Sequence, residues 1–398
     1  MGKNFSLEPI IIRKKMLILH YPKLINKMIK NYALKNLLLI AAGSLLFAIT
    51  SCKKDSKTQV TPGDEIAKPK TLGFYETNVN SHRILMMAIS KIGSQSMGYK
   101  LVFDTGSGGM VIDANGILPA SMITADGFTF SGDSTVVNGI TVTKQISQVV
   151  YGDDNNTMDT VYGNLAYADV TVGDANGNIV VKHMPFFLYY KAVNNKGFQF
   201  GAHSFDVLGV SSEYDITFTS GEYITSPFSY YDPGKGLLRG FKMAALGLSH
   251  FSDAGTYVPA LTLGLTNADI NSGFSVVQLL YLNGDGYIPV MPGLIGVSND
   301  NIAAEMLFDT GTSPYSFIME PNAPPGQIFT LVTNNRVSIS TSTGFNYGYD
   351  VSDHQNLTLV ENPATSGTGI SVFGLDFFIE NEYMLDFTDH MVGIKTAR

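Results

Sequence analysis

Two short stretches of the sequence carry the same pattern, an apolar run followed by Asp-Thr-Gly and a hydroxyl residue. The first copy is Asp104-Thr105-Gly106-Ser107, and the second is Asp309-Thr310-Gly311-Thr312. Two aspartates that a fold brings to about 3 Å of each other cannot both ionise, so they share one proton. One carboxylate then acts as a base toward a bound water, while the protonated one polarises a carbonyl group. The repeat therefore predicts a catalytic carboxylate dyad of Asp104 and Asp309.

The residues that follow each aspartate are suited to supporting such a dyad. In each copy the threonine can brace the partner loop, and the glycine lets the two backbones approach closely. The hydroxyl residue after the glycine can donate a hydrogen bond to the outer carboxylate oxygen. The expected supporting residues are Thr105, Gly106, Ser107, Thr310, Gly311 and Thr312.

A second shared element follows each copy of the motif and indicates how the aspartates are positioned. Val207-Leu208-Gly209 lies downstream of the first copy, and Val372-Phe373-Gly374 lies downstream of the second. Two copies of one two-part unit predict two similar lobes related by a pseudo-two-fold axis. We expect the lobes to span residues 73–270 and 271–398, with the dyad on the floor of a central cleft.

The sequence after residue 73 has the character of β-structure. The chain of 398 residues has only 15% charged residues, 44 Phe and Tyr residues together and no Trp, which favours a strand-rich globular protein. Asn138-Gly139 and Asn176-Gly177 stand between alternating apolar residues, a pattern that predicts β-hairpins. No segment shows a long helical period, so we expect an all-β fold with a few short helices, near residues 236–245 and 376–382.

With these motifs in order, the sequence resembles the pepsin-like, two-lobed aspartic peptidases. Residues 146–153 are similar to the strand and tip of that family's flap, in which a tyrosine precedes a glycine turn, and residues 372–394 are similar to its closing segment. The resemblance implies an all-β, bilobal pepsin-like acid protease fold. It also implies an aspartic-type endopeptidase, a hydrolase that cleaves peptide or protein substrates with no cofactor and no metal. Tyr151, Gly152 and Asp153 are the expected flap residues that contact the substrate.

Two other functions compete with this one. Members of the family often carry a tryptophan a few residues after the first motif, whereas this sequence has Gly108, Gly109, Met110 and Val111 there and no tryptophan anywhere. A catalytically silent surface lipoprotein that binds a peptide or glycan on the same fold is therefore the alternative function. A phosphotransferase with a glycine-rich phosphate loop is disfavoured, because the sequence lacks interleaved helices.

The N-terminal residues differ from the rest of the chain. Lysine and arginine are dense up to residue 35, and the apolar run at 37–49 is too short to span a bilayer comfortably. The lone cysteine, Cys52, follows small residues, as in a bacterial lipoprotein signal. We expect a signal peptide over residues 1–51, with Met28 as an alternative start, and a lipidated Cys52 that begins a flexible tether over 52–72. The expected location is the bacterial cell envelope, anchored in the outer membrane and facing either side.

Charge and cysteine content restrict the partners. Without residues 1–51 the chain has 18 basic and 33 acidic residues, a balance that gives no electrostatic footprint for nucleic acid. A single cysteine excludes an intramolecular disulfide and any multi-cysteine metal site. We therefore expect a monomer whose partners are a peptide substrate and, through the lipid on Cys52, a membrane.

Overall fold

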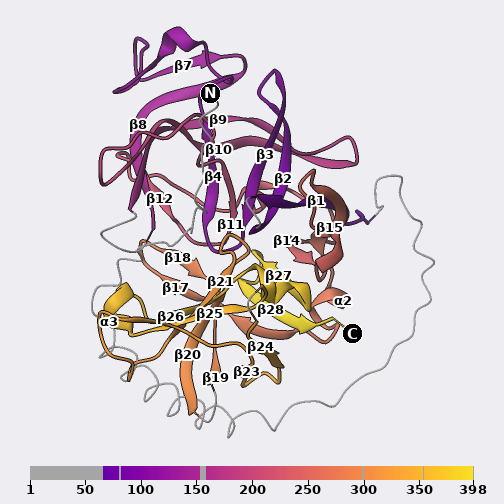
Figure 1. Ribbon diagram of the computed structural model, residues 1–398. Helices are drawn as coiled ribbons and strands as arrows, with labels where there is room; N and C mark the ends of the chain where they lie inside the picture. The colour runs from indigo at the N-terminus through magenta and orange to yellow at the C-terminus, as the bar shows by residue number, and fades with distance from the viewer. Residues whose placement is uncertain (1–65, 80–81, 153–157, 298–299, 353, 398) are drawn as a thin grey trace, which may run out of the picture. The chain divides into compact units, whose positions relative to one another are not determined.

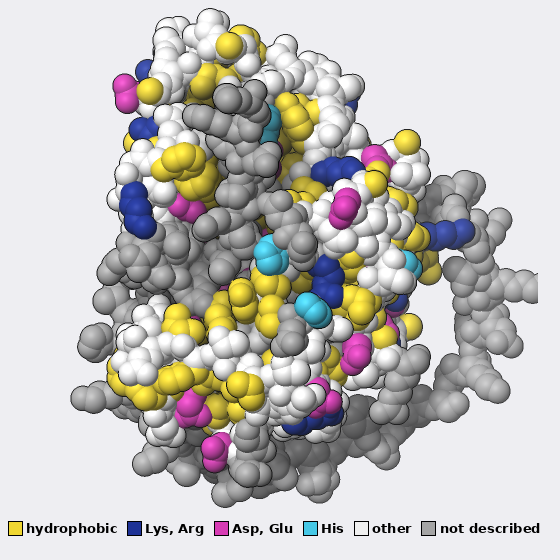
Figure 2. Space-filling view, viewed as in Figure 1, with side chains coloured by type: hydrophobic (Ala, Val, Ile, Leu, Met, Phe, Trp, Pro, Cys, Tyr) yellow, Lys and Arg dark blue, Asp and Glu magenta, His cyan; other side chains and the backbone are white. Residues whose placement is uncertain are grey.

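The computed structural model describes residues 66–79, 82–152, 158–297, 300–352 and 354–397. Ile66–Arg398 belongs to one compact unit. Within the described ranges, no helix combines the length and the apolar character needed to cross a membrane. On the face seen in Figure 2, the Lys and Arg side chains are scattered and form no continuous basic patch.

Most of the described chain is β-strand, arranged in two large sheets (Figure 1). In hydrogen-bonded order, the strands of the larger sheet are β16 (Ser275–Gln278), β28 (Met391–Thr396), β27 (Asn381–Asp386), β14 (Leu238–Met243), β15 (Thr256–Leu265), β1 (Lys70–Val79), β2 (His82–Ile92), β3 (Gln95–Asp104), β11 (Val207–Val210), β4 (Gly108–Asp113), β10 (Gly177–Asn194), β9 (Asp159–Asp174), β8 (Ile140–Tyr151) and β7 (Ser134–Val137). The second sheet, in the same kind of order, contains β22 (Ile328–Thr330), β25 (Leu357–Glu361), β21 (Tyr315–Met319), β26 (Ile370–Phe373), β20 (Asp300–Phe308), β19 (Val290–Val297), β23 (Arg336–Thr341) and β24 (Asn346–Asp350).

The remaining elements are short. Three two-stranded ribbons are formed by β5 (Ile123–Thr124) with β6 (Gly127–Phe128), β12 (Ile216–Thr217) with β13 (Tyr223–Ile224), and β17 (Leu280–Leu282) with β18 (Gly286–Ile288). The helical turns are α2 (Asn267–Ile270), α3 (Pro363–Ser366) and the 3₁₀ turns η1 (Ala120–Met122), η2 (Pro227–Tyr230), η3 (Leu248–His250) and η4 (Leu375–Ile379). The predicted all-β fold with few short helices is confirmed.

The internal repeat has a structural counterpart in each large sheet. Strand β3, which ends in Asp104, pairs in parallel with β11, so that Gly209 lies opposite Asp104. Strand β20 pairs in parallel with β26, with Phe308 opposite Phe373. Each apolar-apolar-Gly element therefore lies beside the strand that leads into its Asp-Thr-Gly motif, which is the arrangement that two copies of one unit require.

Both predicted hairpins are present. Val137 pairs with Ile140 across Asn138-Gly139, and both turn residues have positive φ, as a tight two-residue turn between twisted strands requires. Asp174 pairs with Gly177 in the hairpin between β9 and β10.

One of the two helical expectations is wrong, and the other is met only in part. Residues 238–243 form β14, which lies between β15 and β27 because its backbone groups pair with both strands. Residues 375–379 form the 3₁₀ turn η4, but the chain then becomes extended as β27. Figure 1 shows β27 and β28 as the yellow C-terminal strands.

The predicted division into two lobes at residue 270 stays a prediction. The sheet order shows that strands from both predicted ranges share one sheet. Strands β16, β27 and β28 come from the second predicted range, yet they join the same sheet as β1, β14 and β15. The larger apolar core runs through both large sheets and includes the buried rings of Phe103, Phe241 and Phe308. Burial of each such ring contributes roughly 1.5–3 kcal/mol to folding.

Candidate active site

Both motif aspartates lie at the ends of strands in the interior of the protein. Asp104 is the last residue of β3 and is 0% exposed, and Asp309 directly follows β20 and is 4% exposed. Their strands are held by parallel neighbours, so the two loops start from fixed positions. The Asp309 amide also donates to the Phe373 carbonyl at 2.9 Å, which fixes the start of the second loop.

The two threonines join the loops reciprocally. The Thr105 amide donates to the Thr310 hydroxyl at 3.1 Å, and the Thr310 amide donates to the Thr105 hydroxyl at 3.0 Å. Each hydroxyl also donates across the site, Thr105 to the Phe308 carbonyl at 2.8 Å and Thr310 to the Phe103 carbonyl at 2.7 Å. All four bonds follow one two-fold pattern, so each loop positions the other.

The two glycines bring each backbone against the opposite carboxyl group. A Cβ atom placed on Gly106 would lie 2.5 Å from Cγ of Asp309, and one placed on Gly311 would lie 2.7 Å from Cγ of Asp104. Real Cβ atoms do not approach other heavy atoms this closely, so only glycine fits at either position. The close approach shows that both carboxyl groups occupy one shared site.

Each carboxyl group has the same pair of hydrogen-bond donors. The Gly106 amide and the Ser107 hydroxyl donate to Oδ1 and Oδ2 of Asp104 at 2.8 and 2.5 Å. The equivalent donors to Asp309 are the amide of Gly311, at 2.7 Å, and the hydroxyl of Thr312, at 2.5 Å. These bonds orient both side chains and stabilise the ionised form of a carboxylate.

The electrostatics of the pair favour one retained proton. Burial raises the pKa of the Asp309 carboxyl well above its usual range, and the charge of Asp104 and a side-chain hydrogen bond with it raise it further. The bonds from Thr312 and Gly311 oppose this rise but do not cancel it. A buried pair of this kind can hold one ionised and one protonated carboxyl at the same time, which is the state that can activate a water molecule.

Tyr151, the tyrosine expected in the flap, is buried. Tyr151 is the last residue of β8 and pairs with Asp159 of β9, and its side chain is only 4% exposed. Burial raises the pKa of its hydroxyl, and the charges of Asp104 and Asp206 raise it further. Tyr151 therefore lies within electrostatic reach of the first aspartate.

Of the other two expected flap residues, the structure describes only Gly152. Gly152 is buried with φ of +93°, a conformation that suits glycine. Asp153 lies outside the described residues, and so does the expected lipidation site Cys52. Contact of the flap with a substrate stays a prediction.

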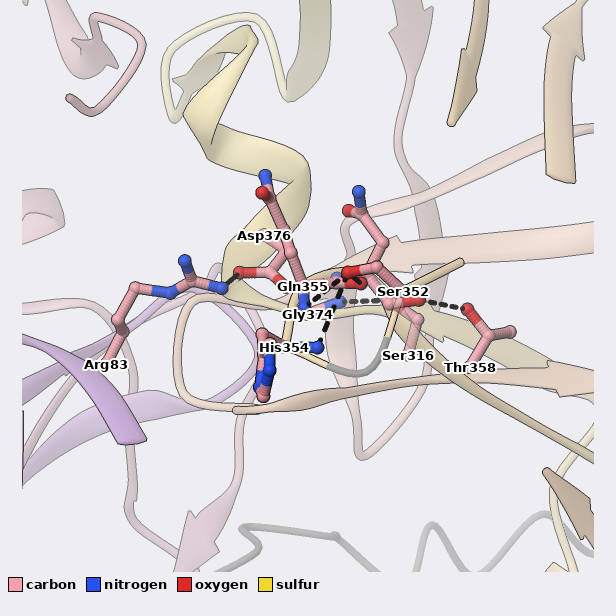
Figure 3. A network of polar contacts seen from close by, with 9 residues as sticks. Arg83, Ser316, Ser352, His354, Gln355, Thr358, Gly374 and Asp376 are labelled. Carbon is pink, nitrogen blue, oxygen red and sulfur yellow. Dashed lines mark hydrogen bonds and ion pairs between the residues drawn. The ribbon is translucent and has the colours of Figure 1, made fainter. Parts of the chain in front are cut away.

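Two polar contacts near the motif loops were not expected from the sequence. The Gly108 amide donates to Oδ2 of Asp215 at 2.5 Å, which fixes the chain just after the first motif. Near the second motif, the Leu375 amide donates to the Thr312 carbonyl at 2.8 Å, and the next residue, Asp376, forms an ion pair with Arg83 of β2. Figure 3 shows the Arg83 side chain pointing toward Asp376 of the turn η4. Isolated acidic residues carry no motif, so the sequence contains no signal for either contact.

The arrangement is suited to acid–base chemistry on a water molecule. It supplies two carboxyl groups in one shared site, fixed backbone and hydroxyl donors to both, and the buried aromatic side chain of Tyr151. In the ranges that the structure describes, no group of three or more His, Cys, Asp or Glu side chains is placed to hold a metal ion.

Comparison with solved structures identifies the fold of the chain. No protein-family profile and no curated protein sequence matches the chain. Among solved structures, the aspartic proteinase from Irpex lacteus aligns with a TM-score of 0.54 at 15% identity, over 82% of this chain and 97% of that one. Basic 7S globulin from soybean aligns with a TM-score of 0.51 at 12% identity, over 83% of this chain and 97% of the globulin. Conglutin gamma, a basic 7S globulin from lupine seeds, has a TM-score of 0.51 at 13% identity, with 83% and 96% covered. The chain therefore has the bilobal, pepsin-like all-β fold.

Proposed function

We propose that this chain is an aspartic endopeptidase in which Asp104 and Asp309 share one proton and activate a water molecule. The observation that carries the proposal is the two-fold arrangement of the motif loops, in which each glycine lies against the opposite carboxyl group. A fold that only needed turns at these positions would not require both aspartates to be buried together, at a cost in desolvation. Mutual burial is what a shared-proton dyad needs.

In the proposed mechanism the two carboxyl groups have different roles. Asp309 holds the proton, because burial and the neighbouring Asp104 raise its pKa, and it donates a hydrogen bond to the carbonyl oxygen of the scissile peptide bond. Asp104, oriented by Ser107 and Gly106, accepts a proton from the attacking water and gives it to the leaving nitrogen when the C–N bond breaks. The charge that develops on the tetrahedral intermediate is then stabilised by groups already in place. Tyr151 excludes water from the intermediate when the flap closes.

A silent binding protein on the same fold is the second candidate, and one observation favours it. Two of the three solved structures above are described as globulins and not as enzymes. The fold therefore does not by itself decide between catalysis and binding. The intact pair of aspartates, with all six supporting residues in place, favours catalysis.

Peptide-library cleavage between pH 3 and pH 7, with and without a statine-type inhibitor, separates the two candidates. We expect endoproteolytic cleavage in acid that the inhibitor blocks, because a shared-proton dyad loses its acid form as pH rises. Binding of library peptides without cleavage at any pH would support the silent protein.

For location, we propose a lipid anchor on Cys52 that holds the enzyme at the outer membrane of a bacterial cell envelope. The support is the sequence alone, namely the apolar run at 37–49 and the small residues before Cys52. Expression of the full chain and of Cys52→Ser, followed by membrane fractionation, tests it. Wild type should sediment with membranes and the variant should not; equal membrane content in both would contradict the anchor.

A further inference from the structure

The aromatic partner of Tyr151 is a residue that no sequence motif indicated. The rings of Tyr151 and Phe205 are stacked, with centroids 5.5 Å apart and planes inclined by 17°. Both belong to a separate apolar cluster that also contains Val111, a small side chain seven positions after Asp104. Since the chain has no tryptophan, Phe205 provides the aromatic surface against which Tyr151 rests.

Phe205 is itself fixed by buried polar contacts. Its amide donates to the Tyr189 hydroxyl at 3.2 Å. The next residue, Asp206, accepts from the Asp113 amide at 2.9 Å and contacts Nδ1 of His203 at 2.8 Å. The Asp206 carbonyl accepts from the Val102 amide at 3.0 Å, which ties this segment to β3, two residues before Asp104. The Phe205 ring therefore has a defined position relative to the first aspartate.

Two further rings pack against this stack. Phe200 packs edge-to-face on Phe205, with centroids 4.8 Å apart and an interplanar angle of 87°. Phe198 in turn packs edge-to-face on Phe200 at 5.2 Å. Offset-stacked and edge-to-face pairs are the geometries in which aromatic rings attract each other beyond their burial.

We infer that Phe205 is the positioning residue for Tyr151, fixing its ring relative to the strand that ends in Asp104 so that the hydroxyl end is in place when a peptide occupies the site. The inference rests on the proposed function. It adds that Phe205 packs against Tyr151 in a chain that has no tryptophan. Phe205 touches the flap residue and not the reacting atoms, so its effect acts through Tyr151.

The decisive variants compare loss of the ring with loss of volume elsewhere in the same cluster. Phe205→Leu removes the stacking partner but keeps an apolar side chain, and Phe205→Tyr restores a ring. Phe187→Leu is the matched control, because Phe187 is fully buried in the same cluster and its ring contact is with Phe218. Thermal unfolding of the full chain shows whether Phe205→Leu and Phe187→Leu destabilise it equally.

We expect Phe205→Leu to lower kcat about 3- to 10-fold with less than about a twofold change in KM, the size of one lost aromatic pair. Phe205→Tyr should recover most of the rate, and Phe187→Leu should stay within about twofold of wild type. A kcat for Phe205→Leu that equals that of Phe187→Leu, or that exceeds wild type, would overturn the inference. A higher rate would mean that the stack holds Tyr151 away from its working position.

A binding measurement keeps the inference testable even if the protein cleaves nothing. In Phe205→Trp the new indole is the only tryptophan of the chain, so its fluorescence reports on the ring next to Tyr151. Adding a statine-type inhibitor should shift this emission, and the shift should disappear in Phe205→Trp combined with Tyr151→Ala. An unchanged emission in a preparation that binds the inhibitor by calorimetry would contradict the pairing. Absence of cleavage together with an intact shift would reject the proposed function alone.

Discussion

The backbone amides of Thr105 and Thr310 each donate a hydrogen bond to the side-chain hydroxyl of the other residue, at 3.1 and 3.0 Å. Each hydroxyl donates a hydrogen bond to a carbonyl of the opposite strand, Thr105 to Phe308 and Thr310 to Phe103. Both threonines are buried, with 0% and 2% exposure. The loops that present the two aspartates are thus joined by buried polar groups. Solvent water cannot replace a hydrogen bond that is lost there.

Replacing Thr105 by valine should therefore destabilise the protein and disturb the dyad. The change leaves the Thr310 amide and the Phe308 carbonyl without their partners, so we expect a loss of roughly 2–4 kcal/mol in the free energy of unfolding. Turnover per folded molecule should also fall, because the loop that presents Asp104 loses its support.

Thr358→Val is the matched control for Thr105→Val. Thr358 is also fully buried, and its hydroxyl bonds to the Asn356 carbonyl and the Tyr349 hydroxyl, outside the motif loops. Denaturant unfolding and peptide turnover of both variants check this; a control with the same activity loss would show a merely structural effect.

The close packing of the glycines makes a second prediction. In Gly106→Ala the new methyl group would meet the carboxyl group of Asp309 at 2.5 Å, and in Gly311→Ala it would meet that of Asp104 at 2.7 Å. We expect each variant to push the carboxyl groups apart and to lose at least about 100-fold in kcat, since a displacement of about 1 Å has that effect. Gly98→Ala, in the same strand as Asp104 but with no atom within 4 Å of the new methyl group, should remain active. Activity of Gly106→Ala equal to that of Gly98→Ala would contradict the shared site.

Glu76 gives the protein a pH-dependent stability that is separate from catalysis. Its side chain is 0% exposed, and its carboxylate oxygens have no hydrogen-bond partner among the described residues. Burial raises the pKa of Glu76 from 4.5 to about 7, with the Gly247 backbone opposing part of the rise and His250 Nδ1 lying 3.8 Å away. A carboxyl whose pKa is higher in the folded state stabilises the fold below its ordinary pKa. That contribution is lost as pH rises from 4.5 through about 7.

The matching experiment compares the unfolding free energy of wild type and Glu76→Gln at pH 4 and pH 8. The glutamine does not titrate, so wild type should lose up to about 3 kcal/mol more than the variant over this interval. Glu320→Gln, at a partly exposed carboxylate, is the matched control for the loss of one carboxyl group. Identical slopes for wild type and Glu76→Gln would contradict the buried titration.

Removing one partner of the ion pair between Arg83 and Asp376 should destabilise the folded protein. It is largely buried, with side chains 15% and 6% exposed, and Asp376 also accepts a hydrogen bond from the Asn356 amide at 2.5 Å. Arg83→Met leaves a buried carboxylate without its cation, so we expect a loss of about 3–5 kcal/mol in unfolding free energy. Adding Asp376→Leu should restore part of that loss.

An exposed ion pair is the control for this double-mutant cycle. Lys182 and Asp169 are 75% and 47% exposed, so Lys182→Met should cost less than about 1 kcal/mol. An additive cycle at Arg83 and Asp376 would show that the two side chains do not depend on each other.

The parts of the fold that could be predicted are those that a local pattern determines. The Asp-Thr-Gly copies and their apolar-apolar-Gly partners are repeated in sequence, and the structure places each pair in parallel strands. Asn138-Gly139 specifies a tight turn by its own backbone preferences. For these features, residues close together in the sequence determine the local structure.

The parts that could not be predicted depend on contacts between distant residues. Residues 238–243 become a strand because β15 and β27 offer hydrogen-bond partners on both sides, and β27 comes more than a hundred residues later. Phe205 meets Tyr151 across 54 positions, and Arg83 meets Asp376 across 293. Neither pair belongs to a recurring motif, so only the folded chain brings it together.

The most direct test of the account is the turnover of a fluorogenic peptide by wild type, Asp104→Asn and Asp309→Asn from pH 3 to pH 7, with the exposed Asp169→Asn as control. We expect wild type to cleave in acid and to lose activity as pH rises through the raised pKa of Asp309. Both dyad variants should be folded and at least about 1,000-fold slower, because an amide is neither the base nor the acid of the reaction. A folded Asp104→Asn or Asp309→Asn that keeps more than a few per cent of the wild-type rate would contradict the dyad.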